Sequence, residues 1–373
     1  MSTEGASGFG SFFLPGPTEV HPEVMAALQL PMTGHRDPAL ERVIAEIDPR
    51  LRSLFRTERP VYVLTGSGTA AMEMGVRGGV LHRALCLVNG AFSDRFRKIV
   101  ELSGKEAGVY EVPWGQAHDP AEVERRLASG EYDAVTVAHS ETSTGVLNPV
   151  AGIAAACRRA AEASGREILT LVDGVSSVGG APVEFDEWGL DFLLTGSQKA
   201  LALPPGLAFC AASKRLLERA RSLPSRGLYL DLLRYHHEWT DHQTPFTPAV
   251  SLIFALAAQL RRMEKEGIEE RWSRHASMAS ACHRWVLEKR ARFGLETLAP
   301  DGFRSPTVTA IQLPGRLRPA SGLLRGLEER GFSVGAGYGQ LGDQTVRVGH
   351  MGDHTVQGVE RLLTVMEEVL AVA

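Results

Sequence analysis

The chain has 373 residues, of which 44% are hydrophobic and 23% charged, as is typical of a soluble globular protein with a large core. Its net charge of −4 provides no basic surface for nucleic acid or an acidic membrane. No stretch has the roughly 18 apolar residues of a membrane helix, and residues 1–10 lack the features of a signal peptide. The four cysteines have no metal-binding spacing. We therefore expect a cytoplasmic protein with reduced thiols, no metal, and no nucleic-acid or membrane partner.

The first part of the chain is predicted to be an irregular arm followed by two helices. Residues 1–18 form the arm, which begins rich in glycine and serine and closes with the sequence PGPT. A short helix is expected over residues 21–28. Apolar residues recur at helical spacing in residues 38–55, which predicts a second, longer helix there.

Residues 61–211 alternate between strand-like and helix-like patterns. Short apolar runs predict strands at 61–65, 84–88, 105–112, 134–139, 168–172, 192–195 and 207–211. Helices are predicted between them at 69–80, 92–102, 120–129 and 153–164. This alternation is typical of an α/β protein with a mostly parallel sheet, here of seven strands, flanked by helices.

The pattern changes after residue 251. Long helices are predicted at 251–265 and 268–293, followed by strands at 307–312 and 345–348 and helices at 321–330 and 355–372. These elements predict a smaller α+β unit. We expect an N-terminal arm (1–18), a large domain (19–262) and a small C-terminal domain (263–373).

Two charged residues after separate apolar runs carry the strongest functional signal. Asp173 ends the run at 168–172, and Lys199 follows the run at 192–195 after a short Gly-Ser-Gln turn. Ligands of parallel sheets bind at the carboxyl ends of the strands, so both side chains are expected at one edge. A lysine that forms a Schiff base and an acid that pairs with a pyridine nitrogen suit pyridoxal phosphate (PLP). Taken singly, such residues are more often a solvated loop lysine and a helix cap.

Three other segments lie at predicted strand ends. Residues 65–69 (TGSGT) precede a helix, where glycines and free backbone N–H groups suit an anion. Phe92 could stack on a planar ring, and residues 139–145 (HSETSTG) supply hydroxyl groups, including that of Thr142. Each pattern also fits a simpler structure: a capped turn, a core phenylalanine or a polar turn.

Arg347 stands out in the small unit. It alternates with Val346 and Val348 on a predicted strand, so its side chain points away from theirs. A guanidinium group in such a place can form a bidentate pair with a substrate carboxylate. A surface arginine or an internal ion pair would give the same pattern.

Together these segments resemble class V aminotransferases of PLP fold type I, near the alanine–glyoxylate and serine–glyoxylate (serine–pyruvate) aminotransferase group. The resemblance extends from residue 15 to residue 352 and is most specific in residues 172–180 (VDGVSSVGG) and 196–206 (GSQKALALPPG). It implies a large domain with a seven-stranded sheet and a smaller C-terminal domain.

The resemblance assigns roles around the cofactor ring. Lys199 would form the Schiff base with PLP, and Asp173 would hold the protonated ring nitrogen. Phe92 would stack on the ring, in place of the tryptophan or tyrosine of many relatives. Val175 would pack against the opposite face, and Thr142 would contact the region of the ring hydroxyl.

The resemblance also assigns residues to the phosphate of PLP. These residues would be Ser67, Gly68, Thr69 and Gln198. In this family the neighbouring subunit also touches the phosphate, and the matching segment here is residues 244–248 (TPFTP). Thr244 and Thr247 would therefore act in the partner's site, and the functional unit would be a homodimer with the active site at the subunit interface.

The implied reaction is PLP-dependent transamination of a small amino acid, such as alanine or serine, with a 2-oxo acid such as glyoxylate or pyruvate. Arg347 would bind the α-carboxylate of the substrate. Phosphoserine aminotransferase is an alternative, because residues 34–36 (GHR) resemble a phosphate-binding segment of that group. A lyase-type class V enzyme is another. A cysteine desulfurase is disfavoured because no cysteine follows Cys282.

Two further classes of protein fit the sequence less well. A non-catalytic binding protein of the same fold would not need the Asp173–Lys199 pair. A nucleotide-dependent dehydrogenase would need the glycine fingerprint of its cofactor site, which residues 65–69 do not match.

Overall fold

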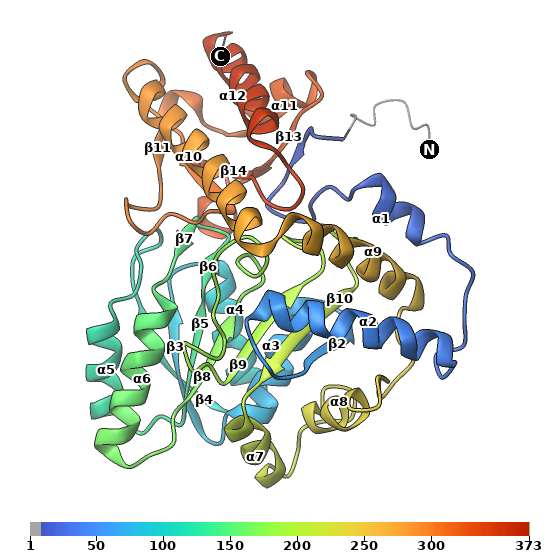
Figure 1. Ribbon diagram of the computed structural model, residues 1–373. Coiled ribbons are helices and arrows are strands. Elements are labelled where there is room, and N and C mark those ends of the chain that lie inside the picture. The colour runs from blue at the N-terminus through green and yellow to red at the C-terminus, as the bar shows by residue number, and fades with distance from the viewer. Residues whose placement is uncertain (1–8, 373) are drawn as a thin grey trace.

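The computed structural model describes residues 9–372 and divides into a large layered part and a smaller part at the top of Figure 1. A seven-stranded sheet with the order β2-β10-β9-β8-β5-β3-β4 forms the centre of the large part. Its strands are β2 (Val61–Thr65), β3 (Arg83–Val88), β4 (Glu106–Glu111), β5 (Ala134–Ala138), β8 (Leu169–Asp173), β9 (Phe192–Gly196) and β10 (Leu207–Ala212). β10 runs antiparallel to both of its neighbours, and the other pairs are parallel. The predicted mostly parallel sheet of seven strands is confirmed.

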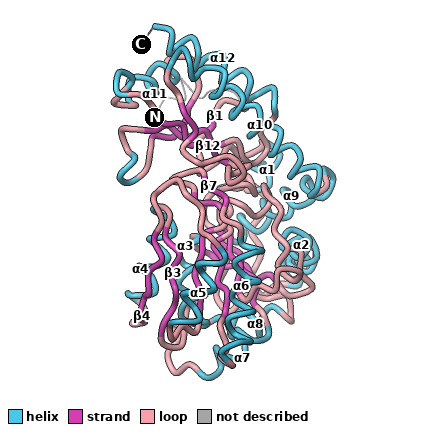
Figure 2. Tube along the Cα trace, turned by 90° about the vertical axis from the view of Figure 1, so that its left-hand side faces the viewer, coloured by secondary structure: helices cyan, strands magenta, loops and turns pink. Residues whose placement is uncertain are grey.

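Helices cover both faces of this sheet. In Figure 2, α3 (Gly68–Gly79) and α4 (Ala91–Leu102) lie on one side, and α2 (Pro38–Phe55) and α9 (Val250–Glu266) on the other. The remaining helices of this part are α1 (Pro22–Ala27), α5 (Pro120–Ser129), α6 (Val150–Ser164), α7 (Lys214–Ser222) and α8 (Leu232–Trp239). The last two were not predicted.

Local sequence explains where several of these helices begin. Asp37 and Asp119 precede α2 and α5, and each carboxylate accepts a hydrogen bond from the backbone N–H two residues later. A proline occupies the first helical position in both cases, where its missing N–H costs nothing. A short hairpin of β6 (Ser140–Glu141) and β7 (Val146–Leu147) follows β5.

The smaller part contains a five-stranded sheet with the order β1-β13-β14-β12-β11. Its strands are β1 (Phe12–Phe13), β11 (Glu296–Thr297), β12 (Val308–Gln312), β13 (Ser333–Ala336) and β14 (Thr345–Gly349). Its helices are α10 (Ile268–Phe293), α11 (Ser321–Glu328) and α12 (Val356–Val372), with short 3-10 turns at Gly315–Leu317 and Gly339–Leu341. The buried apolar residues form a cluster separate from that of the large part, while the domain boundaries stay a prediction.

Part of the predicted irregular arm is ordered by the small sheet. Phe12 and Phe13 form β1, which pairs in parallel with residues 333–334 of β13. A two-residue strand has no periodicity of its own, so only the tertiary pairing reveals it. Residues 1–8 of the arm lie outside the described residues.

Three further features of residues 9–372 concern partners and ligands. No helix in this range is both long and apolar enough to cross a bilayer. Within the same range, no three His, Cys, Asp or Glu side chains are grouped to hold a metal ion. All four cysteines are buried and free of disulfides.

Phe13 offers a test of how strongly the arm is attached. Its ring is fully buried and stacks on His354 at 4.2 Å between centroids. Phe13→Ala should lower the free energy of unfolding by about 3–5 kcal/mol, because it leaves a cavity in the small core. Phe9→Ala, which removes a ring that is 47% exposed, should change it by less than about 0.5 kcal/mol. Urea unfolding followed by circular dichroism measures both, and equal effects would contradict the packing of β1.

Candidate active site

A cavity of about 120 Å³ lies at the carboxyl edge of the large sheet. The ends of β2, β8 and β9 and the starts of α3 and α4 supply its walls. The lining residues are Ser67, Gly68, Thr69, Met72, Phe92, Arg95, Thr142, Asp173, Val175, Gln198 and Lys199. The structure thus brings together every residue predicted to bind the cofactor from within one chain.

Lys199 is enclosed by the N-terminal arm. Lys199 is only 7% exposed, and its Nζ donates a hydrogen bond to the Pro15 carbonyl oxygen. The Thr18 hydroxyl donates to the Lys199 carbonyl oxygen at 3.0 Å. Gly16 adopts a φ of +110°, and a Cβ there would lie 2.5 Å from Lys199 Cδ, so only glycine fits. Burial, aided by the nearby Arg347 charge, lowers the pKa of Lys199 to about 8.

Asp173 is a buried carboxyl group without a cationic partner. It ends β8 and is 5% exposed, and within residues 9–372 its hydrogen bond comes from the Val175 backbone N–H at 2.8 Å. Burial, and to a smaller degree the Glu141 charge, raises the pKa of Asp173 to about 7. A buried carboxylate is costly unless a cation pairs with it. The protonated pyridine nitrogen of PLP fits this requirement.

The start of α3 is suited to a phosphate group. Ser67 is the N-cap residue, its hydroxyl makes no capping bond, and the first turn contains no acidic residue. The free N–H groups and the positive end of the helix dipole are therefore available to an anionic ligand, because no acidic side chain or capping hydroxyl occupies them. A Cβ at Gly68 would lie 2.7 Å from Val175 Cγ2, so this close approach requires glycine.

Phe92 lies among aromatic and cationic groups. Tyr338 stacks on its ring, with centroids 5.2 Å apart and planes 27° apart. The guanidinium of Arg95 lies 4.9 Å and Lys199 Nζ 5.8 Å from the Phe92 centroid. Arg95 also donates to the Tyr338 hydroxyl at 3.2 Å and lies 3.4 Å from Thr69 Oγ1.

Glu141 holds the start of α4, which carries Phe92. Its side chain is fully buried and accepts hydrogen bonds from the backbone N–H groups of Phe92 and Ser93. The hydroxyl groups of Ser93 and Ser143 also donate to it, at 2.9 and 2.6 Å. A carboxylate at a helix N-terminus is favoured by the helix dipole. The orientation of Phe92 toward the cavity therefore depends on Glu141.

Arg347 projects from β14 toward the same region. It is 8% exposed, and it donates to the carbonyl oxygens of Ala336 at 2.8 Å and of Thr142 at 3.3 Å. Burial lowers its pKa from the ordinary value. No carboxylate within residues 9–372 forms an ion pair with it, so its charge is available to an anionic ligand.

Thr244 and Thr247 do not line this cavity. Thr244 is buried and donates to the Phe246 carbonyl oxygen at 2.8 Å, while Thr247 is exposed. Arg36 donates to the carbonyl oxygen of Thr244 and the side-chain oxygen of Gln243, each at 2.8 Å. The segment is therefore held away from the cavity of its own chain.

Comparison with known proteins identifies the family. The profile of the class V aminotransferases matches residues 96–339. The chain belongs to this family. An uncharacterized aminotransferase of Methanocaldococcus jannaschii is 38% identical over 91% of this chain and 87% of its own. The small subunit of a soluble hydrogenase of Synechococcus is 33% identical over 96% and 92%.

Solved structures agree with this family. An aspartate aminotransferase of subgroup IV from Thermus thermophilus superposes with a TM-score of 0.87 and 33% identity, over 97% of this chain and 99% of its own. Other relatives at 28–31% identity are named for transfer to glyoxylate from L-aspartate, serine, alanine or (S)-ureidoglycine. The predicted recognition is confirmed: the protein is a PLP-dependent class V aminotransferase, and its substrates are an amino acid and a 2-oxo acid.

Three residues of this class V site were missed in the sequence. Arg95 follows Phe92 by three positions and therefore shares its helix face, a spacing that could have indicated it. Glu141 lies in the HSETSTG segment, but its role depends on the position of α4. Tyr338 comes from the small part, and no local pattern links it to Phe92.

Asp173→Asn tests how much the buried carboxyl group lowers the free energy of unfolding of the PLP-free protein. Without PLP, the folded-state pKa of about 7 lies above the ordinary 3.8, so the folded chain binds this proton more tightly than the unfolded chain. The free energy of unfolding should therefore fall as pH rises from about 4 to about 7 and then level off, because the bound proton is lost. Asparagine does not titrate, so the variant without PLP should melt above wild type at pH 8 and lose that advantage toward pH 4.

Thermal unfolding with and without PLP measures this effect. With PLP bound, the order at pH 8 should reverse, because the carboxylate then has its cationic partner. A difference between the PLP-free proteins that does not vary with pH would contradict the burial of a titrating Asp173.

Proposed function

We propose that this enzyme transfers the amino group of a small amino acid, alanine or serine, to a 2-oxo acid such as glyoxylate, with Lys199 as the lysine that carries PLP. The observation that carries the proposal is the joint burial of Lys199 and Asp173 at one cavity, with a lowered pKa for the amine and a raised pKa for the acid. Such opposed shifts are typical of functional groups.

The residues predicted to bind the cofactor have the following proposed roles. Asp173 would pair with the ring nitrogen, and Phe92 and Val175 would cover the two ring faces. Thr142 would contact the ring hydroxyl region. The phosphate would be held by four residues of the cavity: Ser67, Gly68, Thr69 and Gln198. When bound, PLP supplies an electron sink for negative charge on the substrate α-carbon.

Lys199 and Arg347 would act on the substrate. With a pKa of about 8, a useful fraction of Lys199 is neutral near physiological pH, so its Nζ can take the proton from the substrate α-carbon and return it. Arg347 would bind the α-carboxylate of the substrate and thereby orient the substrate so that its α-hydrogen points toward Lys199 Nζ. The burial by Pro15 and Thr18 keeps water from the amine.

Glyoxylate is supported as the acceptor by the relatives. Their names combine one acceptor with four donors: aspartate, serine, alanine and ureidoglycine. The donor thus varies across this group while glyoxylate recurs. Glyoxylate has no side chain, so a pocket that is large enough for a donor side chain would not exclude it by size.

The substrates can be assigned by single half-reactions. The purified enzyme should absorb visible light through bound PLP, and alanine or serine should bleach that absorbance faster than aspartate or phosphoserine. Glyoxylate should restore it. Lys199→Ala should lower turnover by at least about a thousandfold, because the acid–base group is lost. Full transamination by Lys199→Ala, or fastest bleaching with phosphoserine, would contradict the assignment.

We also propose that two chains complete each site. The segment 244–248 is held away from its own cavity, and Thr247 is exposed. Exposed apolar side chains lie in the same region: Leu30, Met32, Leu228 and Tyr229 are 51%, 69%, 62% and 42% exposed. Tyr229 stacks on Phe246 of the segment at 5.0 Å, and Met32 is held near it by the Ser251 hydroxyl, which lies 3.5 Å from the Met32 sulfur three residues after the segment ends. A surface of this kind is typical of a protein interface.

The dimer has a direct test. Sedimentation velocity should give about 80.8 kDa, twice the chain mass of 40.4 kDa. Met32→Lys should shift the enzyme toward monomers and reduce turnover, because a charge is then buried at the interface. Leu287→Lys changes a side chain that is equally exposed, at 69%, on α10 and should change neither. A monomeric wild type with full activity would exclude the shared site.

A further inference from the structure

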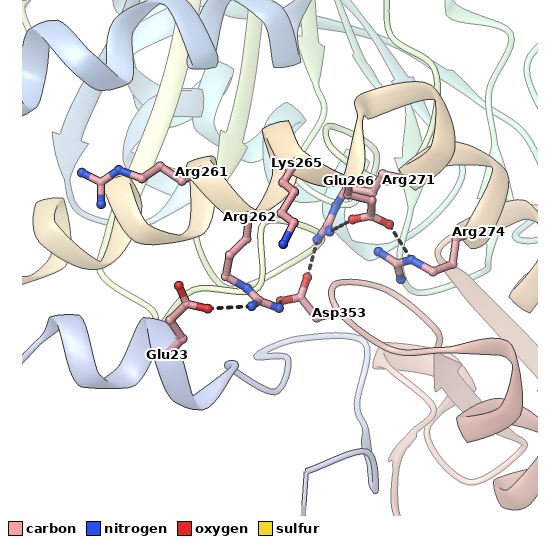
Figure 3. A pocket seen from close by; sticks show the side chains of 8 residues that line it. All are labelled: Glu23, Arg261, Arg262, Lys265, Glu266, Arg271, Arg274 and Asp353. Atoms are coloured by element: carbon pink, nitrogen blue, oxygen red, sulfur yellow. Dashed lines mark hydrogen bonds and ion pairs between the residues drawn. The ribbon is translucent and has the colours of Figure 1, made fainter.

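A second cavity lies between α1, the end of α9, the start of α10 and the loop after β14 (Figure 3). Its volume of about 540 Å³ is in the range of small-molecule sites. Five cationic and three acidic side chains line it: Arg261, Arg262, Lys265, Arg271 and Arg274, with Glu23, Glu266 and Asp353. None of these residues belongs to the class V site described above.

The three carboxylates are already engaged by arginines. Arg271, only 1% exposed, pairs with Glu266 at 2.7 Å and Asp353 at 2.9 Å. Arg274 donates to Glu266 at 2.6 Å, and Arg262 pairs with Glu23 at 2.9 Å. The three acids and their arginine partners, including Arg262 at 3.7 Å from Asp353, therefore form an ion-pair frame, in which Glu23 is the most exposed member at 62%.

Lys265 is the cation that this frame leaves unpaired. Within residues 9–372 its ammonium group makes no ion pair or hydrogen bond, and Figure 3 shows it pointing into the space between Arg262, Arg271 and Asp353. Arg274 uses its Nε and Nη1 on protein acceptors, which leaves Nη2 without one in the described chain. The cavity thus presents spare N–H donors and net positive charge at one place.

Arg261 takes no part in this arrangement. Its guanidinium group points away from the other lining side chains in Figure 3 and pairs with Glu46 at 2.6 Å. Without it, four cations face three acids, and the excess charge is that of Lys265.

The cavity touches the segments that surround Lys199. Arg271 Nη2 donates to the carbonyl oxygen of Ala200, the residue after Lys199, at 2.8 Å. Arg274 donates to the Gly352 carbonyl oxygen at 3.1 Å, in the loop that follows the strand of Arg347. A ligand in the cavity would contact α9 and α10. Because α10 is hydrogen-bonded to Ala200 and Gly352, the ligand could alter the positions of Lys199 and Arg347.

We propose that this cavity binds a small multivalent oxyanion, and that its occupancy changes the rate of transamination. Lys265 Nζ and Arg274 Nη2, which have no acceptor within residues 9–372, would donate to the anion. Arg262 pairs with Glu23 at 2.9 Å and lies 3.7 Å from Asp353, so it would contribute charge rather than a spare donor. A multivalent anion suits the cavity because its unpaired donors come from two different helices, α9 and α10, and charge-assisted bonds to phosphate or carboxylate are strong. The inference goes beyond the proposed function, since it depends on neither the amino donor nor the acceptor.

Calorimetric titration of the PLP-loaded enzyme tests the binding. Inorganic phosphate, pyrophosphate and citrate are the probes, with ionic strength held constant by sodium chloride, and they separate phosphate from polycarboxylate recognition. One anion should bind per chain. Lys265→Gln should weaken the affinity roughly tenfold, whereas Lys265→Arg should retain most of it. Lys214→Gln, an exposed change on α7, is the control and should bind as wild type does.

Arg347→Gln separates the cavity from the substrate site. Because Arg347 is not part of the cavity, this variant should bind the anion with unchanged affinity. Absence of binding by all three probes, equal weakening in Lys214→Gln, or loss of binding in Arg347→Gln would overturn the site. These outcomes are independent of whether alanine, serine or another donor is used.

Turnover tests the coupling. The anion that binds should change kcat/KM of the wild-type enzyme by roughly fivefold, and Lys265→Gln should not respond at the same concentration. Binding that leaves kcat and KM unchanged would overturn the coupling to the reaction site.

Discussion

The burial of two ionisable groups at one edge of a parallel sheet is the constraint on which this structure depends. Asp173 and Lys199 end or follow β8 and β9, and both are less than a tenth exposed. Loss of water disfavours each charged form, which raises the pKa of the acid and lowers that of the amine. The same burial that costs free energy without a ligand raises the fraction of Lys199 that is neutral near physiological pH and provides a carboxyl group that a cationic ring can pair with. Selection for the reaction therefore acts against the stability of the PLP-free fold.

The rest of the molecule serves to close this edge. The arm reaches Lys199 through Pro15 and Thr18, and β1 attaches the same arm to the small sheet. Glu141 anchors the start of α4, which brings Phe92 over the cavity. Arg347 comes from β14 and forms no ion pair with a carboxylate among residues 9–372. The small part thus does more than cover the sheet, because it supplies both the anchor of the arm and the proposed carboxylate ligand.

The proposed anion site beside α9 is a second place from which the geometry of the reaction site can be changed. Its arginines hold the residue after Lys199 and the loop after β14 in one ion-pair network. Within residues 9–372 each acid of this network has an arginine partner and Lys265 has no acidic partner, so the cavity has one positive charge that no acid balances. If an anion binds there, the state of the reaction site becomes sensitive to the concentration of that anion.

The sequence by itself determined the layered α/β fold, the seven strands of its mostly parallel sheet and nine of the residues that line the cavity, because buried strands and the turns after them are local patterns. The strand ends predicted the meeting of Asp173 and Lys199, since the topology of a parallel sheet brings such ends together. Only the tertiary structure decided what lies over them. β1, the stacking of Tyr338 on Phe92, the position of Arg95 and the frame around Lys265 join segments separated by many residues. Contacts of this kind leave no periodic trace in the chain, because each depends on how the two parts pack against each other.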